Sequence, residues 1–332
     1  MEMPMNMKKQ FFIRKKYIEE HDTGLSEKSL ETLAETKAEN TIDAYEADWY
    51  DFCDWCQYHH INDFPVTSET VVNYINDLAE YAKFATIRRR ISALSENFNA
   101  AGLSEKNPCR SWIVRETLIG LSRTMGANQK GKTPIYWDDL QKIFFDMDPE
   151  KITDIRDKAL LLLGFMGAFR RSEISGLDAE DLQFLRQGLV VTIRHSKTDQ
   201  SSLGQQVAIP YLADTSMCGV TAVKNWMETA CITTGPLFRS ISKGGKVSAN
   251  RLSDKSVNLI VKRYAAAIGL DPEMYGAHSL RHGFATYAAL SGVEERLIMK
   301  QTRHRSVEMV RRYINEADLF TNNPISMIFK SK

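Results

Sequence analysis

Apolar residues at helical spacing over positions 29–125, with no strand pattern among them, constrain the fold of this chain more than any other feature. Three stretches place their apolar side chains on one helical face: 41–58, 67–81 and 84–101. Pro108 is expected to open one more helix, which extends to about Met125. We therefore expect a compact all-helical domain at 29–125, preceded by a tail over residues 1–28 that lacks clear periodicity.

A mixed pattern replaces the helical one over residues 137–332. Two runs of β-forming residues, 189–194 and 205–209, flank a polar segment and predict a strand–turn–strand unit. Residues 126–136, GANQKGKTPIY, have the basic and glycine-containing composition of a linker. Further helices are expected at 138–145, 155–166, 255–268, 280–291, 294–300 and 307–314. The expected fold is mainly α, with an all-helical first domain and a mixed α+β second domain that holds a small antiparallel sheet.

Length and composition exclude several classes of protein. A chain of 332 residues suggests two domains at about 150 residues each. The content of 43% hydrophobic and 26% charged residues is typical of a soluble globular protein and argues against disorder. No apolar run is long enough to span a bilayer, and the N-terminal segment lacks an apolar signal core. Five cysteines do not form a disulfide framework in a chain of this length, so we expect a cytoplasmic protein with reduced thiols.

The net charge of +1 conceals an uneven distribution. Residues 29–81 hold twelve acidic residues and one basic residue, whereas residues 83–132 hold ten basic residues and three acidic ones. A basic face of this kind attracts a polyanion such as DNA. The candidate DNA-binding residues are Arg88, Arg89 and Arg90 on one expected helix, and Lys130 and Lys132 in the expected linker. Pairing between oppositely charged helix faces is the alternative that the sequence leaves open.

Three segments of the second half concentrate basic and nucleophilic residues: 167–174, 278–282 and 303–313. Residues 276–312 hold six Arg and one Lys against three Glu. Guanidinium groups match the equatorial oxygens of a phosphorane, and a nearby Tyr supplies a nucleophile, so the combination indicates phosphoryl transfer. Each segment alone is a weak signal, because most Arg residues are ordinary surface residues. The order of the three segments is specific.

This order resembles the tyrosine recombinase family, also called the phage integrases, from about residue 30 onward. The sequence GAFRRSEI is similar to the family's first-arginine motif, RHSKT to its hairpin lysine, and HSLRH to its His-x-x-Arg motif. A late histidine and a tyrosine nine residues beyond it complete the pattern. The resemblance assigns the catalytic roles to Arg170, Glu173, Lys197, His278, Arg281, His304 and Tyr313.

The resemblance implies a site-specific recombinase whose first domain is a SAM-like core-binding domain. Tyr313 is expected to attack the scissile phosphate, with His278 as its base and Lys197 as the acid that protonates the leaving oxygen. Arg170 and Arg281 are expected to hold the non-bridging oxygens. The product is a 3′-phosphotyrosyl ester, which conserves the energy of the phosphodiester. No metal or other cofactor is therefore expected.

The family resemblance also implies partners. Two strand exchanges through a Holliday junction integrate, excise or resolve double-stranded DNA at inverted-repeat sites. A tetramer on DNA is expected, with no membrane partner. The apolar C-terminal segment, residues 325–329, is expected to dock in a neighbouring protomer, and docking on its own domain is the alternative.

One residue departs from the family pattern. Arg303 stands where the family usually has a glycine, immediately before His304. This arginine either alters the local turn or adds a contact to the phosphate.

Several other functions compete with recombination. Gly126, Gly131, Lys132 and Thr133 have phosphate-loop spacing, but a helix precedes them and Pro134 follows. Histidines 278 and 282 stand four residues apart, as metal ligands do, but no Glu follows the first of them. Cysteines 53 and 56, followed by histidines 59 and 60, resemble half of a zinc site but lie on an apolar helix face. A catalytically silent DNA-binding protein of the same fold is the remaining alternative.

Overall fold

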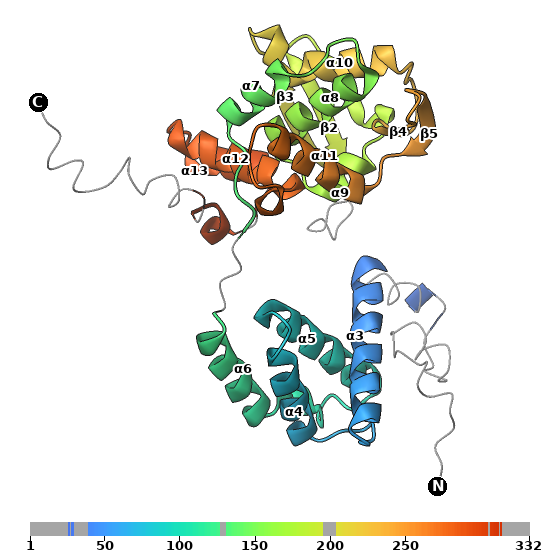
Figure 1. The fold of residues 1–332 in the computed structure, drawn as a ribbon, viewed down its shortest axis with the longest axis vertical. Coiled ribbons are helices and arrows are strands. Elements are labelled where there is room, and N and C mark those ends of the chain that lie inside the picture. Colours follow the sequence, from blue (N-terminus) through green and yellow to red (C-terminus); the bar gives the residue numbers. More distant parts are fainter. Residues whose placement is uncertain are drawn as a thin grey trace, which may run out of the picture. The chain divides into compact units, whose positions relative to one another are not determined.

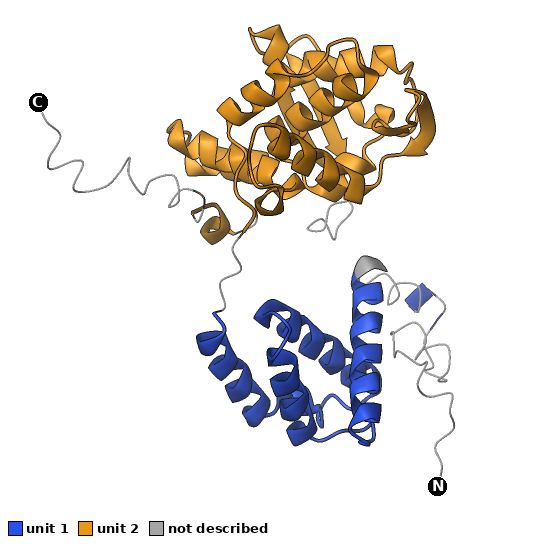
Figure 2. Cartoon of the chain, in the orientation of Figure 1, with its two compact units in different colours: residues 1–130 blue, residues 131–332 orange. Residues whose placement is uncertain are grey.

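Two compact units make up the chain, residues 1–130 and residues 131–332 (Figure 2). The computed structural model describes residues 26, 28–29, 39–126, 131–194, 204–304, 306–311 and 313. Helices dominate both units, and within the described residues only the second unit contains strands (Figure 1). The expected mainly α fold with small antiparallel sheets is confirmed.

The described part of the first unit is helical, as expected. Its α-helices are α3 (Glu39–Tyr58), α4 (Ser68–Ala79), α5 (Phe84–Ala100) and α6 (Trp112–Thr124). The expected single helix from Pro108 is wrong, because Pro108–Arg110 form a separate 3₁₀ turn. Ser111 is extended and caps α6, with its side-chain oxygen accepting the N–H of Val114.

The core of the first unit is built from one apolar face of each helix. Phe52 of α3, Ile75 of α4 and Ile87 of α5 are fully buried. Burial of each side chain of this size contributes roughly 1.5–3 kcal/mol. Cys53 and Cys56 join this core from α3, and burial raises the pKa of both thiols. The two cysteines are therefore neutral packing residues.

The second unit surrounds one buried helix. Its helices are α7 (Trp137–Phe145), α8 (Ile152–Met166), α9 (Arg171–Gly176), α10 (Gly219–Thr229), α11 (Asp254–Ala267), α12 (Ala277–Leu290) and α13 (Glu295–Thr302). Positions 307–311 and 313 are also helical. Leu160, Leu161, Leu162 and Leu163 of α8 are all fully buried, and α8 contacts both α10 and α12. The core of this unit therefore lies around α8.

Two small antiparallel sheets complete the second unit. One sheet has the order β1 (Leu182–Leu185), β2 (Gly188–Ile193), β3 (Gln205–Pro210), and the other pairs β4 (Arg239–Ile241) with β5 (Val247–Arg251). The expected strand–turn–strand unit corresponds to β2 and β3, in which Val191 pairs with Val207. Residues 195–203, which connect these strands and include Lys197, lie outside the described residues.

The second half of the expected linker belongs to the second unit. Within residues 131–136, the N–H of Ile135 donates to Ser279 O at the start of α12 (3.1 Å), and the Ile135 side chain is fully buried. Gly283 faces this backbone so closely that a Cβ atom there would lie 1.8 Å from Ile135 O. The expected boundary at residue 136 is therefore too late. The segment 131–136 packs as part of the second unit.

Candidate active site

Arg170 and Glu173 form a closed hydrogen-bonded pair at the start of α9. Arg170 is extended and precedes the helix, so the buried carboxylate of Glu173 receives both its N–H (2.8 Å) and its Nη1 (2.7 Å). Burial alone would raise the pKa of Glu173, but the charges of Arg303 and Arg170 and the hydrogen bond from the Arg170 N–H lower it. Glu173 is therefore an anion that orients Arg170. The Arg170 side chain keeps 23% of its surface exposed.

Arg281 reaches the same place from α12. Its residue exposure is only 1%, and its Nη1 donates to Ala168 O (2.7 Å) in the turn that follows α8. Its Nη2 is buried and has no hydrogen-bond partner among the described residues. Burial and the positive charges of Arg170 and Arg303 lower the pKa of Arg281. A buried guanidinium with an unused donor is typical of an anion-binding site.

His278 lies one helical turn before Arg281 on α12, on the same face. The residue remains exposed to solvent, as a substrate-facing group must be. Desolvation by the surrounding protein, together with the charges of Arg281, His282 and Arg170, lowers the pKa of His278 to about 4. The imidazole is therefore neutral at physiological pH and available to accept a proton.

His304 follows the C-terminal turn of α13 and is buried. Its Nδ1 lies 2.8 Å from Thr302 Oγ1, and that hydroxyl donates to Ile298 O (2.7 Å). Because the hydroxyl proton is already used, we assign the His304 proton to Nδ1, which leaves Nε2 as an acceptor. Burial and the charges of Arg281 and Arg170 lower the pKa of His304 to about 3. The motifs do not predict Thr302; a hydroxyl two residues before the histidine is the signal that could have indicated it.

Tyr313 lies against both histidine-bearing segments. Its ring centroid is 4.7 Å from that of His282 and 5.6 Å from that of His304. The residue is 7% exposed and packs with Val310 and Ala285. The phenol is also close enough to Arg281 to offset a small part of the lowering of that guanidinium's pKa.

The site as a whole carries excess positive charge. Three guanidinium groups, those of Arg170, Arg281 and Arg303, surround the carboxylate of Glu173. The nearby imidazoles of His278 and His304 are neutral. Close packing of like charges is unfavourable unless an anion joins them. The structure thus brings together six of the seven residues expected at the site. The seventh, Lys197, lies outside the described residues.

Comparison with known proteins places this chain in a family. Residues 135–319 match the phage integrase family. An integrase/recombinase XerD homolog from Selenomonas ruminantium is 45% identical over 326 residues, which cover 98% of this chain and 96% of the relative. The chain belongs to the phage integrase family. It is a tyrosine recombinase, as the motif order predicts.

Solved integrase structures share the two-unit fold. The XerH site-specific recombinase, bound to a palindromic difH substrate in a post-cleavage complex, aligns with a TM-score of 0.66 and 16% identity. The alignment covers 96% of this chain and 94% of the XerH chain. A lambda integrase tetramer bound to a Holliday junction aligns with a TM-score of 0.55 and 16% identity, over 85% of this chain and 74% of that one. At these identities the likeness concerns the fold.

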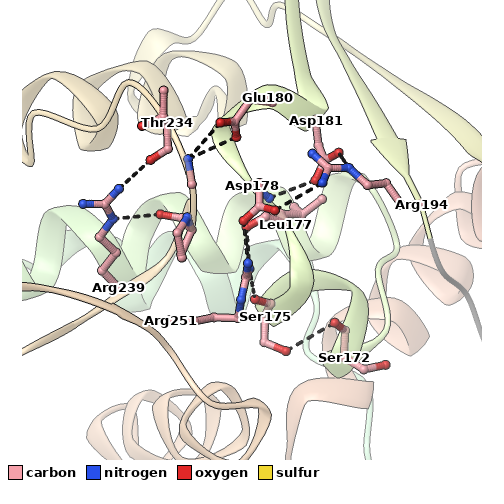
Figure 3. A network of polar contacts seen from close by, with 12 residues as sticks. Ser172, Ser175, Leu177, Asp178, Glu180, Asp181, Arg194, Thr234, Arg239 and Arg251 are labelled. Atoms are coloured by element: carbon pink, nitrogen blue, oxygen red, sulfur yellow. Dashed lines mark hydrogen bonds and ion pairs between the residues drawn. The ribbon is translucent and has the colours of Figure 1, made fainter.

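A polar network supports the strand that leads toward the integrase's expected lysine (Figure 3). Arg194, immediately after β2, donates from Nε to Asp181 (2.5 Å) and from Nη1 to Asp178 (3.4 Å). Asp178 also accepts from Arg251 at the end of β5 (2.5 Å). Arg251 donates in addition to the carbonyl oxygens of Ser175 and Leu177, at the end of α9. The end of β2 is therefore fixed to the helix that begins beside Arg170.

The three consecutive arginines of α5 differ in their surroundings. Arg90 is only 16% exposed and pairs with Asp51 of α3. Arg89 pairs with Asp48 of α3 (2.5 Å), and Arg88 is exposed. Arg89 and Arg90 therefore pair with acidic residues of their own unit, which is the alternative that the sequence left open. Of the linker candidates, Lys132 donates to the carbonyl of Glu273, and Lys130 lies outside the described residues.

The competing phosphate-loop and metal sites do not form among the described residues. No helix begins at Lys132 and Thr133, so the phosphate-loop alternative is wrong. Among all the residues that the structure describes, no group of three or more His, Cys, Asp or Glu side chains is placed to hold a metal ion. His282 directs its Nδ1 to the carbonyl of Lys132 (2.8 Å). None of the helices in the described ranges has the length and apolarity of a membrane span.

Proposed function

We propose that this integrase cuts and rejoins double-stranded DNA at specific sites, with Tyr313 as the nucleophile. The observation that carries the proposal is the cluster of half-buried Arg170 with buried Arg281 and Glu173, which has surplus positive charge and lies beside Tyr313. A phosphodiester is the anion that such a cluster with an adjacent phenol is suited to bind and attack.

The reaction begins at the phenolic oxygen of Tyr313, which attacks the scissile phosphorus as its proton passes to a base. Neutral His278 is the proposed base, because its lowered pKa keeps it deprotonated at physiological pH. Arg170 and Arg281 bind the non-bridging oxygens, on which charge builds up in the transition state. Loss of one preorganised donor of this kind costs about 3–4 kcal/mol of barrier. His304 can donate a hydrogen bond to the same oxygens only when its Nε2 is protonated. The negative charge of the bound phosphate would favour that protonation.

The phosphorus–O5′ bond breaks as the phosphorus–phenol bond forms. Lys197 is proposed to donate the proton that the leaving 5′ oxygen takes up, which gives a free 5′-hydroxyl. The 3′-phosphotyrosyl ester retains the energy of the original phosphodiester. Attack by a 5′-hydroxyl of a partner strand reverses the step and regenerates Tyr313, so neither a metal nor ATP is consumed.

The DNA target is proposed to be an inverted repeat. The fold of the chain is that of the XerH recombinase, which was solved on a palindromic substrate. Arg88 on α5 is exposed and is the best-placed member of its arginine row for a phosphate contact. Arg89, Lys130 and Lys132 are further proposed contacts, Arg89 by exchanging its partner Asp48 for a phosphate. All five cysteines are free, which fits the proposed action in the cytoplasm.

Assembly is proposed to proceed through an apolar groove of the second unit. The groove has a volume of about 490 Å³ and lies between α7, α8, β3, α12 and α13. Phe165, Ile209, Phe284 and Leu297 contribute to its lining. The apolar segment 325–329, which lies outside the described residues, is the proposed occupant, supplied by a neighbouring protomer. Four subunits linked in this way would exchange strands through a Holliday junction, the substrate on which the lambda integrase tetramer was solved.

A nicked suicide substrate tests the nucleophile. The substrate carries inverted repeats taken from the DNA that flanks the gene, and cleavage near the nick releases a short fragment that cannot religate. The wild-type protein should accumulate an adduct that survives detergent, whereas Tyr313→Phe should bind the DNA equally well and form none. An adduct in the variant removes Tyr313 from the role. Binding without any adduct in the wild-type protein supports the catalytically silent alternative.

A further inference from the structure

Arg303 is the one arginine of the site whose terminal nitrogens are fully occupied by protein acceptors. Its Nη2 donates to Glu173 Oε2 (2.6 Å) and to Ala168 O (3.3 Å), and its Nη1 donates to Gly167 O (3.0 Å) and Gln301 O (3.2 Å). The side chain is 5% exposed. Its terminal nitrogens thus have no donor left for a phosphate, whereas its Nε is buried and has no hydrogen-bond partner among the described residues. In this geometry the terminal nitrogens of Arg303 are therefore not available for the contact to the phosphate that the sequence left open.

The backbone of Arg303 shows why the family position favours glycine. The residue has φ 56° and ψ 39°, in the left-handed region, and ends α13. A side chain is disfavoured in this conformation. Here the guanidinium group lies over the ring of Phe169 at 5.1 Å, and its contacts keep the strained residue in place.

The acceptors of Arg303 are the same groups that orient the two phosphate-binding arginines. Glu173 Oε1 accepts from Arg170 Nη1, and Glu173 Oε2 accepts from both the Arg170 N–H and Arg303 Nη2. Ala168 O receives both Arg281 Nη1 and Arg303 Nη2. Removal of Arg303 would therefore take away one of the two hydrogen bonds to Glu173 Oε2 and loosen the carbonyl that holds Arg281.

The contact between Arg303 and Glu173 has a second consequence, because Glu173 shares its negative charge between two arginines. One carboxylate cannot neutralise two guanidinium groups, so a Glu173 that also pairs with Arg303 neutralises Arg170 less completely. Without Arg303, the whole negative charge of Glu173 would fall on Arg170. The attraction of Arg170 for a phosphate oxygen would then weaken.

We propose that Arg303 is a positioning residue, which orients Arg170 and Arg281 for the scissile phosphate through Glu173 and Ala168 and does not touch the phosphate itself. The proposal rests on the recombinase function proposed above. It concerns only how this chain arranges the site.

The test compares Arg303→Gly with the wild-type protein on two nicked suicide substrates. Glycine suits the left-handed backbone, so the variant loses the guanidinium group without new strain. On the ordinary phosphate, we expect DNA affinity within about threefold of wild type and an adduct rate lower by about 10²-fold. On a scissile methylphosphonate, which lacks the negative charge that Arg170 and Arg281 bind, the rate difference between the two proteins should shrink to about threefold or less.

Two further measurements separate the possible outcomes. Arg303→Lys keeps a charge beside Glu173 but cannot reach all three carbonyl oxygens that Arg303 contacts, so its rate should fall between those of wild type and glycine. Combining Arg303→Gly with Glu173→Gln should lower the rate by less than the product of the single effects, because the two residues act through one contact. Equal slowing on both substrates, or no slowing on either, overturns the proposal. A wild-type protein that forms no adduct with the ordinary phosphate instead overturns the proposed function.

Discussion

Two histidines of the site remain neutral for the same physical reason. His278 and His304 lie beside Arg281 and Arg170, whose fixed positive charges add to the effect of desolvation. Protonation of either imidazole would place another cation in a cluster that already has an excess of them. Both rings are therefore proton acceptors until a phosphate arrives, and an anion at the site would raise both pKa values.

Acid should destabilise the folded second unit through His304. Its folded pKa is about 3, whereas an unfolded histidine titrates near 6.5, so the unfolded state alone takes up this proton as the pH falls below about 6.5. For one such histidine, each unit by which the pH falls in this range lowers the free energy of unfolding by up to about 1.4 kcal/mol. Denaturant titrations between pH 6.5 and 4.5 should show a shallower slope for His304→Gln than for wild type. Parallel slopes would exclude His304 as a source of acid sensitivity.

Gly283 should tolerate no side chain. Its missing Cβ leaves room for Ile135 O, a backbone atom that cannot rotate away. Gly283→Ala should therefore cost roughly 1–3 kcal/mol or more in thermal or denaturant unfolding. Gly120→Ala is the matched control, because a Cβ there meets nothing within 4 Å in helix α6. That substitution should stabilise the chain by about 0.5–1 kcal/mol. A neutral Gly283→Ala variant would show that residues 131–136 do not pack as described.

At the scale of elements, periodicity predicted the long helices other than α10 and the β2–β3 pair, because each buries a regular apolar face. Strands β1, β4 and β5 and the six-residue α9 are too short to show a period, and the sequence pattern predicts none of them. The eleven-residue α10 is also absent from the predicted elements. Motif order predicted seven residues for the candidate site, and the structure brings six of them together, with Lys197 outside the described residues. It did not predict the partners of Arg303 or the pairing of Arg90 with Asp51, because those contacts depend on how separate helices pack.

The arginine row of α5 provides a matched pair of variants. Arg88→Ala should weaken DNA binding and reduce the slope of log K against log salt by about one, with unchanged thermal stability. Arg90→Ala should instead cost roughly 1–3 kcal/mol of stability, because it removes the cation paired with Asp51 and leaves that carboxylate only the hydroxyl of Tyr74, and should leave the salt slope of the folded protein unchanged. Salt titrations and thermal melts of both variants separate the two roles. Identical behaviour of the two variants would contradict the assignment.

At the scale of the whole molecule, the apolar groove of the second unit is the proposed docking site of the apolar C-terminal segment, residues 325–329. Deletion of residues 325–332 should leave binding to a single DNA site nearly intact and should reduce the pairing of two sites. Cleavage should become inefficient or unregulated, because docking would position the helix that carries Tyr313. Native gels with one-site and two-site DNA measure both effects. A truncated protein that melts earlier as a monomer, but assembles normally on DNA, would show that the segment docks on its own chain.

The hydrogen bonds of residues 131–136 also determine where this chain can be joined to a different DNA-binding unit in a designed chimera. Ile135 is bound to the start of α12, and the carbonyl of Lys132 is the partner of His282, whose ring lies against Tyr313. A chimera that carries a different DNA-binding unit should therefore be joined before Gly131, so that these six residues stay with their own catalytic unit. A junction at residue 136 would place foreign sequence against His282, whose ring contacts the nucleophile.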